Sequence, residues 1–140
     1  MITDVPHHQS AQKLNIPLFV SRIPAGFPSP ADDYLEKHID LNEHLIEHPA
    51  STFLVRVNGD SMVNAGILNG DILVVDRSVR AASGKVIVAI LNGEFLVKRF
   101  RKQAGKLFLI SENPDYEPTE IAEDSDFEVW GVVVHAIHKV

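Results

Sequence analysis

The feature that most constrains the fold is a series of short apolar runs that begins near Thr52, each bounded by turn-forming residues. These runs are apolar or alternating and are separated by Gly, Asn, Asp and Pro, a pattern typical of β-strands joined by short turns. The Asn92-Gly93 pair between two of them suits a two-residue type I′ turn. We therefore expect a mainly β domain with strands near 53–57, 72–75, 86–91, 94–100, 106–110 and 127–138.

The N-terminal part of the chain has a different character. Residues 1–28 contain four prolines and little periodicity, which indicates an extended arm. Ser29-Pro30 resembles a helix start, and Asp40 to Glu43 resembles a capping box, so we expect short helices at 31–38 and 41–47. We assign residues 1–49 to this arm with its short helices and residues 50–140 to the β domain.

Composition limits the classes of partner and compartment. The formal net charge is −6, which argues against a broad phosphate-binding surface, so we expect no direct binding to nucleic acid. The chain has no cysteine, and its start lacks the basic and apolar regions of a secretory signal. Its longest apolar run, 86–91, is far shorter than the ~20 residues of a membrane helix. We expect a cytoplasmic protein with no membrane contact.

Two residues carry candidate chemistry: Ser61, in a turn, and Lys98, inside an apolar strand pattern. A serine hydroxyl needs a base to become a good nucleophile, yet only about one lysine in 2,500 is neutral at pH 7. If Lys98 shares a strand face with Leu96 and Phe100, burial lowers its pKa and makes it a usable base. Considered alone, each residue has an ordinary structural interpretation. Ser61 would be a turn residue, and Lys98 would lie on an edge strand or extend its amine to solvent. Together they form a candidate Ser-Lys dyad, with the backbone N–H groups around Asp60 and Met62 as candidate oxyanion donors.

A competing motif is His44-Leu45-Ile46-Glu47-His48, which fits the H-x-x-E-H spacing of a class of zinc peptidases. On a helix the two histidines share one face, but Pro49 stops that helix at once, in a fold that we expect to be mostly β. We favour a solvated helix face, and we expect neither a metal nor a cofactor.

Four stretches, in their order and spacing, resemble the self-cleaving LexA and UmuD family. They are Ala25-Gly26, Gly59-Asp60-Ser61-Met62, 70–76 and 93–99, and the likeness runs from about Pro17 to the C-terminus. Residues 27–31 and 40–42 resemble the UmuD branch in particular. The resemblance implies a LexA-like peptidase β-fold in which Ser61 attacks the Ala25-Gly26 bond and Lys98 acts as general base.

The same resemblance implies a role and partners. Proteins of the UmuD branch are accessory subunits of an error-prone translesion DNA polymerase in the bacterial SOS response. We therefore expect a homodimer, self-cleavage promoted by a RecA filament on single-stranded DNA, and association of the shortened chain with the polymerase subunit UmuC. Only 25 residues precede Gly26, too few for a helix-turn-helix domain, so we do not expect a repressor. The alternative is a non-catalytic, dimeric β docking module in which Ser61 is a turn residue and Lys98 a surface charge.

Overall fold

The computed structural model describes residues 14–19 and 35–140. The chain divides into two compact units, Met1–Glu47 and His48–Val140. Among the described residues, no helix combines the length and the apolar content that a membrane crossing requires.

The described residues of the first unit form a two-stranded antiparallel ribbon and one short helix. Strand β1 (Ile16–Phe19) pairs with β2 (Leu35–Ile39). Helix α1 (Leu41–Leu45) follows directly, and Asp40 caps it by accepting the backbone N–H of Asn42 at 2.9 Å. The capping residue that the sequence suggested is therefore confirmed, although the helix ends two residues before its expected end.

The helix expected at 31–38 is wrong over residues 35–38, which belong to β2. Their partner strand, β1, lies about 20 residues earlier in the chain. Capping signals and helix propensity are local and carry no information about such a distant partner. Pairing with β1 overrides the weak helical preference of residues 35–38. Residues 31–34, the Ser29-Pro30 start signal and the Ala25-Gly26 bond lie outside the described residues.

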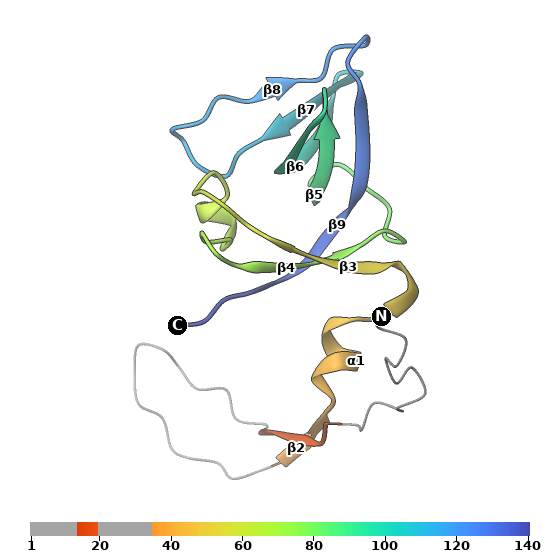
Figure 1. Cartoon of the computed structure of the whole chain (residues 1–140), viewed down its shortest axis with the longest axis vertical. Helices are drawn as coiled ribbons and strands as arrows, with labels where there is room; N and C mark the ends of the chain where they lie inside the picture. Colours follow the sequence, from red (N-terminus) through yellow and green to blue (C-terminus); the bar gives the residue numbers. More distant parts are fainter. Residues whose placement is uncertain (1–13, 20–34) are drawn as a thin grey trace, which may run out of the picture. The chain divides into compact units, whose positions relative to one another are not determined.

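The second unit is built around a seven-stranded antiparallel sheet, which confirms the mainly β fold (Figure 1). The strand order is β3-β4-β9-β5-β6-β7-β8. Two single-turn helices, η1 (Pro49–Ser51) and η2 (Val63–Ala65), flank β3. The strands are β3 (Thr52–Arg56), β4 (Ile72–Asp76), β5 (Val86–Leu91), β6 (Glu94–Gln103), β7 (Lys106–Ile110), β8 (Thr119–Glu120) and β9 (Phe127–Ile137).

Strand β9 holds the two halves of this sheet together. Its first half pairs with β5 and its second half with β4, so in Figure 1 it runs from the β5–β6–β7 group to the β3–β4 pair. Each of these pairings contains a register shift, which bends the sheet where β9 changes partner. Gly131 lies at this point, and a Cβ atom there would stand only 2.7 Å from Cγ1 of Val75. The close approach of β4 and β9 therefore requires a glycine.

Apolar clusters cover both faces of β5. Val88 belongs to one cluster, with Met62 and Leu73, whereas Ile87 belongs to another, with Phe100 and Val132. Alternate residues of a strand point to opposite faces, so this strand is buried on both sides. The uninterrupted apolar run 86–91 has this physical cause.

The hairpin between β5 and β6 has the turn that the sequence predicted. Asn92 and Gly93 both have positive φ angles, 49° and 85°, as a type I′ turn requires. The turn places Leu91 opposite Glu94 and, further along, Ile87 opposite Lys98. The face on which Lys98 lies is thus fixed by this turn.

Candidate active site

Ser61 lies in the turn that follows β3, and its neighbours hold that turn in place. Gly59 has a φ of 95°, which favours glycine, and its N–H donates to Asn69 Oδ1 at 2.8 Å. Met62, next to the serine, is only 2% exposed and belongs to the apolar core. The buried methionine anchors a turn whose serine remains half-buried.

Lys98 lies near the middle of β6 and is also half-buried. Its Nζ donates a hydrogen bond to Ser111 Oγ at 2.6 Å. Desolvation by burial lowers the pKa of the Lys98 amine below its ordinary value. The direction is the one that a general base requires, because it increases the neutral fraction near neutral pH.

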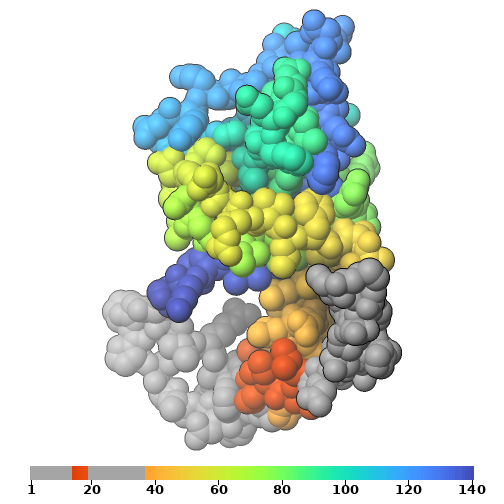
Figure 2. Space-filling model, viewed as in Figure 1, coloured from red at the N-terminus to blue at the C-terminus, as the bar shows by residue number. Residues whose placement is uncertain are grey.

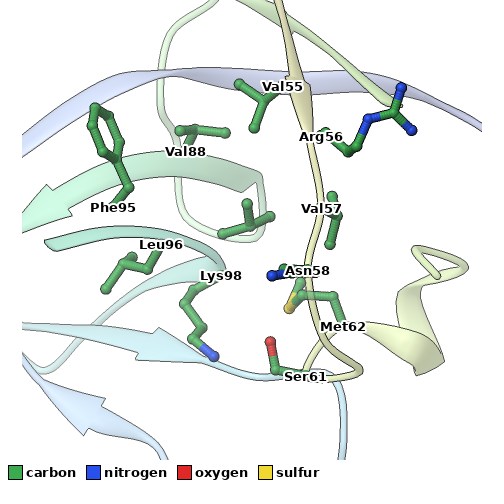
Figure 3. A pocket seen from close by; sticks show the side chains of 11 residues that line it. Val55, Arg56, Val57, Asn58, Ser61, Met62, Val88, Phe95, Leu96 and Lys98 are labelled. Carbon is green, nitrogen blue, oxygen red and sulfur yellow. The ribbon is translucent and has the colours of Figure 1, made fainter. Parts of the chain in front are cut away.

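Ser61 and Lys98 line the same cleft, which has a volume of about 340 Å³. Figure 3 shows the two side chains pointing toward one another from opposite sides of it. Among the described residues, no hydrogen bond joins the two groups, and the amine bonds to Ser111 instead. Of the other lining residues, Arg56 and Asn58 are polar, and the rest are apolar: Val55, Val57, Met62, Val88, Phe95, Leu96 and Val97.

The segment after β7 is tied to the turn that carries Ser61. Asn113 Nδ2 donates to the carbonyl of Asp60 at 2.9 Å, and the hydroxyl of Tyr116 donates to Asp60 Oδ1 at 2.8 Å. The N–H of Asn64 in turn donates to the carbonyl of Glu112 at 2.8 Å. In Figure 2 the light-blue atoms of this segment lie against the yellow-green atoms of the serine turn. The two segments therefore position the cleft together.

Tyr116 links the serine turn to the lysine. Its ring centroid lies 5.3 Å from Lys98 Nζ, within the range of a cation–π contact. The hydrogen bond to Asp60 raises the pKa of the Tyr116 hydroxyl, because it favours the protonated phenol. At neutral pH the tyrosine is a neutral aromatic face beside the amine.

Three residues of this arrangement were missed in the sequence: Ser111, Asn113 and Tyr116. The sequence did contain a signal for Ser111. Ala104-Gly105 can form a two-residue turn, which would have fixed the register between β6 and β7. Asn113 and Tyr116 lie in a segment without strand or helix pattern, so nothing local pointed to them.

The zinc hypothesis has no support in the described residues. Helix α1 ends at Leu45, before Glu47 and His48, so the helical spacing that the motif needs is absent. The Nδ1 atom of His48 lies instead 2.6 Å from Asp76 Oδ2. Within residues 14–19 and 35–140, no group of three or more His, Cys, Asp or Glu side chains is arranged to hold a metal ion.

Comparison with known proteins identifies the family. The model of the family described as "Peptidase S24-like" matches residues 17–134. The chain belongs to this peptidase family. It is 42% identical to Protein SamA of Salmonella typhimurium over 139 residues, which cover 99% of this chain and 96% of that protein. Protein ImpA of Escherichia coli is 43% identical over 127 residues, 88% of this chain and 83% of ImpA.

The LexA repressor of Bordetella parapertussis is also similar to this S24-like chain. The two are 38% identical over 130 residues, which cover 93% of this chain but only 59% of the repressor. The resemblance to the LexA and UmuD family, drawn from four short motifs, is thereby confirmed, and with it the membership of an SOS-related family of self-cleaving peptidases.

Proposed function

We propose that the chain is a serine endopeptidase that cuts its own Ala25-Gly26 bond, with Ser61 as nucleophile and Lys98 as general base. The observation that supports this most directly is the shared cleft, in which a serine hydroxyl and an amine of lowered pKa point toward one another. Membership of the S24-like family supports the same chemistry.

The reaction follows from the properties of the two groups. Neutral Lys98 takes the proton of Ser61 Oγ while that oxygen attacks the carbonyl carbon of Ala25. The C–N bond to Gly26 then breaks, and the Lys98 ammonium returns its proton to the leaving amine. The same amine then takes a proton from water, whose oxygen attacks the acyl carbon of Ala25. The ester C–O bond to Ser61 breaks, the ammonium returns the proton to Ser61 Oγ, and the N-terminal fragment leaves as a carboxylic acid. Backbone N–H groups of the Asp60–Met62 turn are the candidates for stabilising the oxyanion of each tetrahedral state.

The proposed biological role is that of an SOS-response protein activated by this cleavage. In this role a RecA filament on single-stranded DNA promotes the cut. The product, residues 26–140, then acts as the homodimeric accessory subunit of an error-prone translesion polymerase with UmuC. The similarity to SamA and ImpA over most of their lengths supports this role. No direct contact with nucleic acid is required, in keeping with the net charge of −6.

Mass spectrometry of the purified chain after incubation at alkaline pH tests the peptidase function. A product that begins at Gly26 is expected from the unaltered chain, and neither Ser61→Ala nor Lys98→Ala should produce it. Ser125→Ala and Lys102→Ala are matched controls, since both lie outside the cleft and Lys102 is on the same strand as Lys98. Gly26→Val should slow the cut, because a branched side chain then has to enter the cleft beside the scissile bond.

Absence of the Gly26 product at every pH would favour the alternative function, a non-catalytic dimeric docking module. Continued cleavage by Ser61→Ala would also contradict the proposal, since it would move the nucleophile elsewhere. Cleavage at the normal rate by Gly26→Val would contradict the assigned bond.

A further inference from the structure

Ser111 is the hydrogen-bond partner of Lys98, and the register of the sheet places it there. The β6–β7 pairing ends with Arg99 opposite Ile110, and Lys98 and Ser111 are the next residues of the two segments beyond that pair. The hairpin therefore brings the two residues near one another, and the Lys98 side chain completes the contact, with 2.6 Å between Nζ and Oγ.

We propose that Ser111 is a positioning residue that holds the amine of Lys98 in the orientation needed to take the proton of Ser61. The inference rests on the proposed Ser61–Lys98 dyad and adds a third member to it. A neutral amine carries two N–H groups and one lone pair. When one N–H is held by Ser111 Oγ, rotation about the terminal bond of the lysine is restricted, and the lone pair stays on the side of the cleft.

The hydrogen bond between Lys98 and Ser111 also acts after Lys98 has been protonated. Once Lys98 has taken the proton it is an ammonium with three N–H groups, and Ser111 Oγ continues to accept one of them. A hydroxyl that accepts from the charged form stabilises that form, as does the face of Tyr116 at 5.3 Å. Ser111 thus keeps the ammonium in a half-buried site until the proton passes to the leaving amine of Gly26.

The ionisable groups around Lys98 are few. Tyr116 and Asp60 are hydrogen-bonded to each other, and Glu112 is paired with Arg99. On the other side of β6, strand β5 carries no ionisable residue from Val86 to Leu91. Among the described residues, no carboxylate is hydrogen-bonded to the Lys98 amine. The amine donates to the hydroxyl of Ser111 instead.

The test is the rate of self-cleavage of the full chain between pH 6 and 10 for Ser111→Ala and Ser111→Thr. Ser111→Ala should lower the rate at the high-pH plateau by about tenfold, since the ammonium that forms in the transition state loses a charge-assisted hydrogen bond. It should also move the midpoint of the profile to lower pH, because the ammonium loses an acceptor. Ser111→Thr keeps a hydroxyl and should restore both values, and Ser125→Ala should change neither.

A second measurement separates this inference from the proposed function. The 13C resonance of the Lys98 ε-carbon can be titrated in intact Ser61→Ala protein, with and without Ser111→Ala. A lower lysine pKa in the double variant is expected. An unchanged pKa, an unchanged cleavage profile, or a lower plateau with an unmoved midpoint would each overturn the role of Ser111. By contrast, absence of the Gly26 product from the unaltered chain would overturn the peptidase function itself, whatever the titration shows about the contact.

Discussion

Asn113 donates a side-chain N–H to the carbonyl of Asp60 at 2.9 Å and so ties the segment after β7 to the residue that precedes Ser61. The asparagine is only 8% exposed, and its Oδ1 also accepts the N–H of Asp115 at 3.0 Å. It therefore braces the serine turn against the strand pair that carries Lys98.

Asn113→Ala should destabilise the fold and slow self-cleavage together. Removing the amide takes one of two donors from the Asp60 carbonyl, which keeps the N–H of Val63 at 3.2 Å, and takes the side-chain acceptor from the Asp115 N–H, at a cost of about 1 kcal/mol. Urea unfolding of a Ser61→Ala background measures the first effect without interference from cleavage, and the rate of appearance of the Gly26 product measures the second. Glu117→Ala, an exposed change in the same segment, is the control and should alter neither. A loss of stability with an unchanged cleavage rate would show that the bond does not position Ser61.

Lys98 should lower the stability of the fold at neutral pH. Burial lowers its pKa in the folded chain, whereas the unfolded chain keeps the ordinary value near ~10.4. Between the two pKa values the unfolded state binds more protons, so stability should rise with pH through that window. Lys98→Met, in a Ser61→Ala background, should raise the urea midpoint at pH 7 and remove this dependence. Lys102→Met, on the same strand but exposed, should do neither; a lower midpoint for Lys98→Met would show that the amine stabilises the site.

Asp76 should make the fold sensitive to acid. Its carboxylate is 3% exposed and accepts hydrogen bonds from the hydroxyl and N–H of Ser78, at 2.7 and 2.9 Å, with further bonds to His48 and Ser51. These bonds, those of Ser78 first, hold the pKa of Asp76 well below its usual range. The stability that they confer is present above the unfolded pKa of ~3.9 and is lost as the pH falls below it.

The measurement for Asp76 is the urea midpoint between pH 6 and 2.5 for the unaltered chain and for Asp76→Asn. The variant should be less stable at pH 6, because an amide replaces one charged acceptor oxygen by a donor, and its midpoint should fall less on acidification. Asp124→Asn, in an exposed loop, is the control. Parallel acid profiles for the unaltered chain and Asp76→Asn would contradict this account.

Six of the seven strands of the second unit could be predicted because each carries its own signal: an apolar run, and turn residues at its ends. Strand β8 (Thr119–Glu120) was missed, because its two residues form no apolar run. Asn92-Gly93 even fixed the register that turns Lys98 toward the cleft. The bond from Asn113 to Asp60 spans 53 residues and involves a segment without periodicity, so no local pattern encodes it. Strand β2 was missed for a related reason, since its stability depends on β1 and not on its own composition. The sequence alone did not show which distant segments pair with one another. The residues that hold Ser61 and Lys98 in place, Asn113 and Ser111, are brought there by such long-range contacts.

Ala104→Asn should stabilise the hairpin between β6 and β7. Gln103 is opposite Lys106, so Ala104 and Gly105 form a two-residue turn, and both have positive φ angles, 52° and 74°. An alanine in the left-handed region is strained by about 1 kcal/mol, whereas asparagine tolerates it, as Asn92 does in the preceding hairpin.

The expected gain is part of that ~1 kcal/mol, measured as a higher urea midpoint in a Ser61→Ala background. Ala104→Val is the matched opposite, because a β-branched side chain is disfavoured at positive φ, and it should lower the midpoint. Since this turn sets the register of the hairpin that brings Ser111 near Lys98, Ala104→Val should also slow self-cleavage in the active chain. Equal midpoints for the asparagine and valine variants would show that the turn does not adopt the left-handed conformation at position 104.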